Sequence, residues 1–73
     1  MSNNRATLLI LGRRLREARE KKGFSQEELA ARAGFDRTYV SLVERGRRNL
    51  SILNLFRFAK ALDIAPADLV RGL

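Results

Sequence analysis

The residues best suited to bind another molecule gather on one face of a predicted helix over residues 37–44. Arg37, Thr38, Ser41 and Arg45 recur there at helical spacing, with few acidic neighbours in the chain. Arginine side chains donate several hydrogen bonds, and hydroxyl groups can donate or accept. This face is therefore a candidate recognition surface. The alternative is that it forms the solvated side of an ordinary helical hairpin.

Two short predicted helices joined by a glycine turn position this face. Ser25 and Glu28 have the spacing of a capping box, which predicts that the first of these helices begins there. Asp36 is expected to cap the second helix. Gly34 lies between them, where a residue that tolerates positive φ can close the first helix. This arrangement is typical of a helix-turn-helix.

The N-terminal part of the chain predicts a longer helix before this pair. Apolar residues recur at helical spacing from Arg5 or Thr7 to Lys22. Residues 1–4 are polar and are expected to be disordered. The length of 73 residues predicts one compact domain over residues 1–73.

The C-terminal part of the chain predicts two further helices, so the fold is expected to be all-α with five helices. Ser51 is expected to cap the fourth helix. The inward stripe of this helix is expected to contain Ile52, Leu55, Ala59 and Leu62. A short fifth helix is expected over Ala65–Val70, with a proline in its first turn. The helix-turn-helix is then formed by the second and third helices.

The composition indicates an anionic polymer as partner. Lysine and arginine total 15 against 8 acidic residues, which gives a net charge of +7. A merely solvated basic surface is the alternative. The chain has no histidine and no cysteine, so it offers no nucleophile–base pair and no set of metal ligands. We therefore expect no enzymatic activity, no cofactor, no metal and no small-molecule substrate.

The hydropathy pattern predicts a cytoplasmic protein, with the nucleoid as the place where it would meet an anionic polymer. No apolar run approaches the roughly 20 residues that a membrane span requires. The first helix is basic and amphipathic, which can also indicate binding to a membrane surface. Its apolar face lacks large aromatic residues, and the neighbouring helices need that face for packing. We therefore expect no membrane partner.

Double-stranded DNA is the anionic polymer that best fits this pattern. The major groove admits a helix, and its base edges distinguish all base pairs. Arg37 can donate two hydrogen bonds to a guanine, although a solvated arginine at a helix start is the alternative. Ser25 and Gln26, with the unpaired amides of the first turn, suit a phosphate oxygen.

The loop after the third helix offers further contacts to DNA. Arg47, Arg48 and Asn49 suit a neighbouring phosphate, and Arg48 is also expected to reach a base edge. The alternative is a loop exposed only to solvent.

The segment SQEELAARAGFDRTYVSLVERG, followed by a helix rich in leucine and phenylalanine, resembles the phage repressor/Cro-like (XRE-type) helix-turn-helix family. Within that family, DRTYVSLVERGRRNLS is most similar to the controller proteins of bacterial restriction–modification systems. The resemblance extends over residues 8–70. It implies a lambda-repressor-like domain that acts as a homodimer on a pseudo-palindromic operator and regulates transcription. Leu42 departs from the pattern, because a small or polar residue is more usual there.

The residue types and the resemblance together predict a set of site residues. The base-reading residues are expected to be Arg37, Thr38, Ser41 and Arg48. The backbone-binding residues are expected to be Ser25, Gln26, Tyr39, Arg45, Arg47, Asn49 and Ser51. The resemblance also implies a dimer surface on the last two helices, with the candidates Phe58, Ile64, Leu69, Val70 and Leu73. The resemblance further implies that Arg19 and Glu44 form an internal ion pair, and this agrees with electrostatics because Glu44 would repel phosphate if it faced DNA.

The expected function is sequence-specific transcriptional regulation of restriction–modification genes. One alternative is an antitoxin-like, phage or plasmid regulator that binds a partner protein and regulates its own operon. RNA binding by a monomer is a further alternative, which the lack of a platform of stacking aromatic residues disfavours. RNA polymerase is a candidate partner if binding activates transcription, although no residue in the sequence indicates such a contact.

Overall fold

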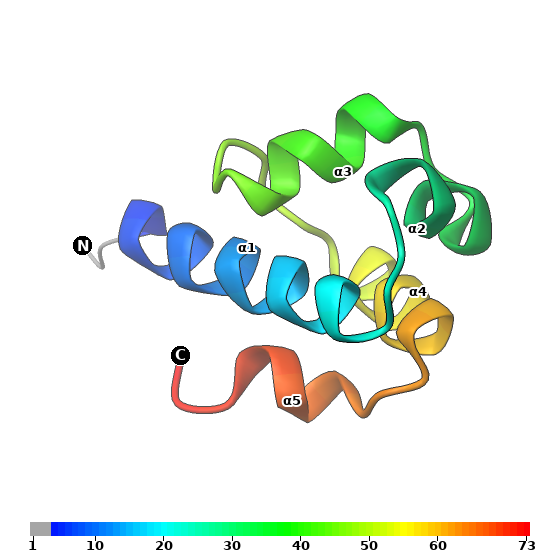
Figure 1. Ribbon diagram of the computed structural model, residues 1–73. Helices are drawn as coiled ribbons and strands as arrows, with labels where there is room; N and C mark the ends of the chain where they lie inside the picture. Colours follow the sequence, from blue (N-terminus) through cyan, green and yellow to red (C-terminus); the bar gives the residue numbers. More distant parts are fainter. Residues whose placement is uncertain (1–3) are drawn as a thin grey trace.

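The computed structural model describes residues 4–73, which form five helices and no strand. The helices are α1 (Asn4–Lys21), α2 (Gln26–Ala33), α3 (Arg37–Glu44), α4 (Ile52–Leu62) and α5 (Pro66–Val70) (Figure 1). The predicted all-α fold with five helices is confirmed. The expected disorder of residues 1–3 lies outside the described residues, whereas Asn4 already belongs to α1. No helix in the described part is long and apolar enough to cross a membrane.

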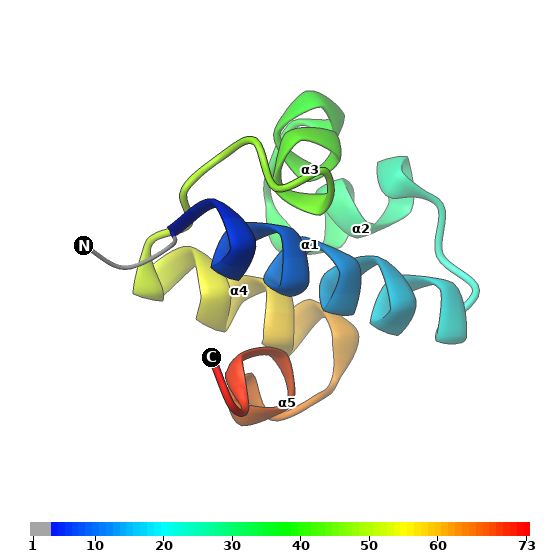
Figure 2. The ribbon, with the colours of Figure 1, turned by 90° about the vertical axis from the view of Figure 1, so that its left-hand side faces the viewer.

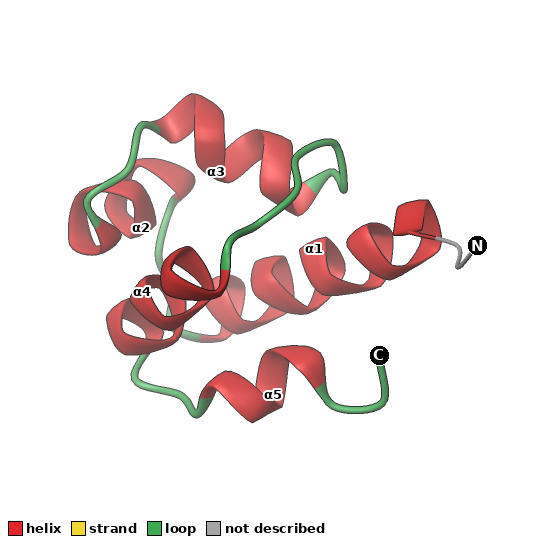
Figure 3. Cartoon of the chain, turned by 180° about the vertical axis from the view of Figure 1, so that it is seen from behind, coloured by secondary structure: helices red, strands yellow, loops and turns green. Residues whose placement is uncertain are grey.

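The helices place α3 and α5 on opposite sides of α1. Figure 1 shows α3 above α1 and α5 below it, and the view turned by 90° in Figure 2 agrees. Seen from behind, α4 crosses in front of α1 (Figure 3). The outer face of α3 is therefore left uncovered, while its inner face packs against α1 and α2.

Local capping explains where two of the helices begin. The hydroxyl oxygen of Ser25 accepts a hydrogen bond from the backbone N–H of Glu28, and the Glu28 carboxylate accepts one from the N–H of Ser25, at 3.0 and 2.9 Å. The predicted capping box is thus confirmed. Ser51 caps α4 by accepting from the N–H of Asn54 at 3.1 Å.

The start of α3 is held differently from the prediction. Asp36 has the backbone geometry of an N-cap, but its side chain makes no capping hydrogen bond. Next to it, the Phe35 ring packs against Tyr39 and Phe58, with ring centroids 4.8 and 4.7 Å apart. Aromatic packing against α4 therefore fixes the first turn of α3 in place of a side-chain cap.

The core contradicts two residues of the predicted dimer surface. Phe58 and Leu69 are 0% and 1% exposed, so they are packed within one copy of the chain and the prediction was wrong for them. Phe56 is 48% exposed instead. Residues two apart on a helix point about 200° apart, so only one of these two phenylalanines can face the core. Ile52 was also wrongly placed in the inward stripe, because it is 61% exposed.

A close contact between α1 and α3 depends on Gly12. A Cβ atom at this position would lie 2.5 Å from the carbonyl oxygen of Glu44 and would also meet that of Val43. Gly12 therefore lets the backbone of α1 touch the end of α3, which sets how deeply α3 sits in the domain.

Candidate nucleic-acid interface

The N-terminal end of α3 presents the predicted base-reading residues to solvent. Arg37 and Thr38 are exposed, and Ser41 is half-buried one turn further along. Val40 and Val43 on the opposite side of the helix are buried in the core. The amphipathic pattern of α3 thus leaves its polar face available to a ligand. That these residues read bases stays a prediction.

Arg37 makes an ion pair that the sequence did not indicate. Its Nε lies 3.3 Å from Oε2 of Glu27, which is in the first turn of α2, and the two side chains are 58% and 68% exposed. The pair joins the starts of the two helices of the helix-turn-helix. It lies on the surface, so its net contribution to stability is small.

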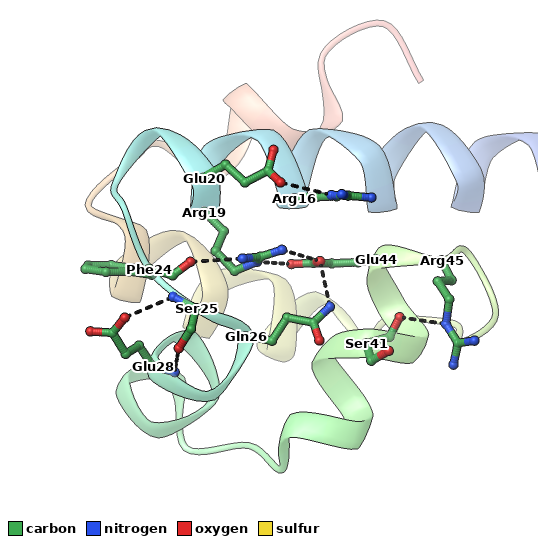
Figure 4. A network of polar contacts seen from close by, with 10 residues as sticks. All are labelled: Arg16, Arg19, Glu20, Phe24, Ser25, Gln26, Glu28, Ser41, Glu44 and Arg45. Atoms are coloured by element: carbon green, nitrogen blue, oxygen red, sulfur yellow. Dashed lines mark hydrogen bonds and ion pairs between the residues drawn. The ribbon is translucent and has the colours of Figure 1, made fainter.

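The predicted ion pair of Arg19 and Glu44 is present and buried (Figure 4). Nε and Nη2 of Arg19 donate to the two carboxylate oxygens of Glu44 at 2.7 and 3.0 Å. Nη1 donates to the carbonyl oxygen of Phe24 at 2.9 Å. The hydrogen bonds with Glu44 raise the pKa of Arg19, although burial acts in the opposite direction. The pair ties α1 to the end of α3.

Gln26 joins this network from the first turn of α2. Its Nε2 donates to Oε1 of Glu44 at 3.0 Å, as Figure 4 shows. A side-chain amide has two hydrogens, so this bond leaves the other for a second acceptor such as a phosphate oxygen. The hydroxyl of Ser25 is in a similar position, because it accepts the capping bond and keeps its hydrogen to donate.

The ring of Tyr39 packs against the core, and its hydroxyl group contacts a side chain of α4. The ring stacks against Phe58 with a centroid distance of 6.1 Å, and the guanidinium of Arg48 lies 5.7 Å from the ring centroid. The hydroxyl oxygen accepts from Nδ2 of Asn54 at 3.0 Å. The hydroxyl hydrogen therefore remains available to another acceptor, which is compatible with the predicted backbone contact.

The loop after α3 brings basic side chains together with the start of α1. Arg45 and Arg47 line an open hollow of about 490 Å³ with Arg5, which the sequence reasoning missed. The three positive charges make this hollow suited to an anion such as a phosphate group. Arg5 lies 40 residues before Arg45 in the chain, so no local spacing could reveal that they meet.

The remaining predicted loop residues are at the surface. Arg48, Asn49 and Ser51 are all exposed. The side-chain oxygen of Asn49 accepts from the N–H of Leu50 at 2.8 Å, and Ser51 caps α4. Their backbone-binding role stays a prediction, and so does base reading by Arg48.

Arg57 of α4 supports the turn of the helix-turn-helix and was also missed. Its Nε and Nη2 donate to the carbonyl oxygens of Ala33 and Gly34 at 3.1 and 2.7 Å. Its guanidinium lies 4.1 Å from the centroid of the Phe35 ring. A positive charge at the C-terminal end of α2 is favourable to the helix dipole. Gly34 has φ 79°, so the predicted left-handed residue closes α2 at this point.

Comparison with known proteins identifies relatives over most of the chain. The helix-turn-helix family model HTH_3 matches residues 15–69. The chain is 42% identical over 71 residues to the control protein C.BamHI of Bacillus amyloliquefaciens, covering 96% of this chain and 85% of that protein.

Two solved structures of restriction–modification controller proteins are similar to this one. C.AhdI from Aeromonas hydrophila has a TM-score of 0.86 and 55% identity, covering 88% of this chain and 97% of that chain. C.Esp1396I, solved as a tetramer in complex with its natural 35 base-pair operator, has a TM-score of 0.77 and 37% identity, covering 81% of this chain and 78% of that chain. The predicted family is confirmed by these findings. The chain belongs to the HTH_3 helix-turn-helix family, and its relatives include controller proteins of restriction–modification systems.

Proposed function

We propose that this protein is a DNA-binding transcriptional regulator that acts as a homodimer on a pseudo-palindromic operator of restriction–modification genes. The observation that carries this proposal is the exposed start of α3, where Arg37 and Thr38 face solvent and Arg37 pairs with Glu27 in the first turn of α2. The relation to controller proteins, one of them solved on its operator, supports the proposal. The protein then works in the cytoplasm on the nucleoid. RNA polymerase is its further partner where binding activates transcription.

The geometry favours one docking mode on the duplex. The first half of α3 enters the major groove, and Arg37 donates to the edge of a guanine. The start of α2, with Ser25 and Gln26, then lies against a phosphate. The hollow formed by Arg5, Arg45 and Arg47 faces the backbone on the other side of the groove.

Exposed apolar side chains support a dimer surface on α4 and at the C-terminus. The large apolar residues left exposed there are Ile52, Leu53, Phe56, Val70 and Leu73. Exposed apolar surface of this kind is typical of a protein–protein contact. Of the dimer-surface residues predicted from the sequence, Val70 and Leu73 are exposed and remain candidates. Ile64 is half-buried and packs against the core of its own copy. One copy carries one α3, so reading two half-sites about one DNA turn apart requires a second copy.

Binding titrations against the DNA upstream of the protein's own gene test the proposal, together with the DNA upstream of any restriction or methyltransferase gene found beside it. We expect a dimer to bind an inverted repeat there at least ~10³-fold more tightly than a scrambled duplex. Arg37→Ala should remove the preference at one base pair in each half-site and leave the others intact. Equal affinity for every duplex, or capture of a stoichiometric protein partner in place of DNA, would refute it.

A further inference from the structure

Glu27 lies where a surface that binds phosphate would not be expected to carry a negative charge. It is in the first turn of α2, next to the amides and side chains proposed to bind a phosphate. The capping box is formed by Glu28, so capping does not explain Glu27. Its side chain is 68% exposed, so core packing does not explain it either. Its carboxylate forms an ion pair with Arg37, and its negative charge also acts at longer range on Arg19.

We infer that Glu27 is a specificity-determining residue, which orients Arg37 toward a base edge and keeps it from the phosphates. The inference rests on the proposed base-reading role of Arg37. The ion pair joins Oε2 of Glu27 to Nε of Arg37, on the side of the guanidinium. The two terminal nitrogens form a fork that suits N7 and O6 of guanine.

The same pair disfavours binding to DNA of the wrong sequence. A long arginine side chain without a tether can turn to a phosphate, and that contact gains affinity on every sequence. The tether to Glu27 restricts this movement of Arg37. On a site without the guanine, the Glu27 carboxylate remains close to the DNA backbone and repels it. Glu27 thus lowers non-specific affinity more than specific affinity, and the ratio of the two rises.

The test compares Glu27→Ala and Glu27→Gln with the matched control Glu20→Ala. Glu20 forms an exposed ion pair with Arg16 on α1 at 3.1 Å, so the control makes the same change in charge away from α3. The affinities for the operator and for a scrambled duplex are measured at one salt concentration. We expect Glu27→Ala to tighten binding to the scrambled duplex and to lower the ratio of affinities about tenfold. Glu27→Gln should show the same change to a smaller degree, because its amide oxygen can still accept from Arg37.

The control variant defines the result that overturns the inference. Glu20→Ala removes one negative charge as well, and it should tighten binding to both duplexes by the same factor. If Glu27→Ala changes the ratio no more than Glu20→Ala does, Glu27 does not determine specificity. Glu27 is exposed, so replacing it should not unfold the protein and a changed ratio cannot be assigned to unfolding. A thermal unfolding curve of each variant checks this directly.

A double variant separates this inference from the proposed function. If Arg37→Ala removes the preference at one base pair and Glu27→Ala in that background changes it no further, the two residues act as one unit. If Arg37→Ala removes the preference at that base pair but the single variant Glu27→Ala keeps it with an unchanged ratio of affinities, only the role of Glu27 fails. If Arg37→Ala leaves base preference unchanged, the base-reading role of Arg37 fails and the inference fails with it.

Discussion

Nη2 of Arg57 donates a hydrogen bond to the carbonyl oxygen of Gly34 at 2.7 Å, so α4 holds the turn between α2 and α3. The last carbonyl groups of a helix lack partners within the helix, and Arg57 supplies partners for two of them. The orientation of α3 therefore depends on a side chain that lies outside the helix-turn-helix.

Replacing Arg57 should loosen this turn. Arg57→Ala removes two charge-assisted hydrogen bonds and the contact with Phe35, and we expect the free energy of unfolding to fall by about 1–3 kcal/mol. Denaturation by urea measures it. Arg57→Lys keeps the charge but cannot bond both carbonyl groups as a planar fork. Its stability should therefore lie between those of the wild type and Arg57→Ala. Equal stability of all three proteins would show that the turn needs no support from α4.

Breaking the buried ion pair should have a larger effect on stability. Glu44→Ala leaves Arg19 charged and without its carboxylate partner, where the two side chains are 11% and 3% exposed. We expect a loss of about 3–5 kcal/mol in the free energy of unfolding. Glu20→Ala, at the exposed pair with Arg16, should cost little. A similar small loss for both variants would contradict the buried character of the Arg19–Glu44 pair.

The raised pKa of Arg19 gives this effect a defined dependence on pH. A cation whose pKa is raised by folding contributes stability below its unfolded pKa, and this is lost only as the pH rises through the folded value. Arginine already loses its proton only at strongly alkaline pH. The difference in unfolding free energy between wild type and Glu44→Ala should therefore stay constant from neutral to moderately alkaline pH.

What the sequence could predict was set mainly by local chemistry. Ser25 and Glu28 are three residues apart, so the capping box and the start of α2 followed from spacing alone. The contact of Arg57 with Gly34 joins residues 23 apart in the chain. Arg5 and Arg47 line the same hollow across an even longer separation in the chain. Such contacts depend on how the helices cross, which no helical period reveals.

The error over the phenylalanines has a related cause. A stripe drawn through Ile52 and Leu55 leaves Phe56 and Phe58 on either side of it, and spacing alone does not decide which one is buried. In the structure, Phe58 packs against Phe35 and Tyr39 of the helix-turn-helix. Which phenylalanine is buried was therefore decided by how α4 packs against α2 and the first turn of α3. The ion pair of Arg19 and Glu44 also joins distant residues, and family resemblance made it predictable.

Arg5 should contribute to the salt dependence of DNA binding. If it contacts a phosphate together with Arg45 and Arg47, Arg5→Ala should lower the slope of log affinity against log salt by about one unit per copy. Base preference should stay the same. Arg71→Ala removes the same charge on the α5 side, where Arg71 pairs with Asp68, and should leave the slope nearly unchanged. An equal change of slope for both variants would indicate a general effect of charge in place of a contact in the hollow.

Two phenylalanines of α4, two residues apart in the chain, should affect different properties of the protein. Phe56 is exposed, so Phe56→Ala should weaken the dimer at least about tenfold and leave the stability of one copy nearly unchanged. Phe58 fills the core, so Phe58→Ala should lower the unfolding free energy by about 3–5 kcal/mol. Sedimentation equilibrium measures the first effect and chemical denaturation the second. Because binding to both half-sites requires the dimer, Phe56→Ala should also lose operator affinity at low protein concentration. A dimer that is unchanged by Phe56→Ala would place the contact between copies away from this face of α4.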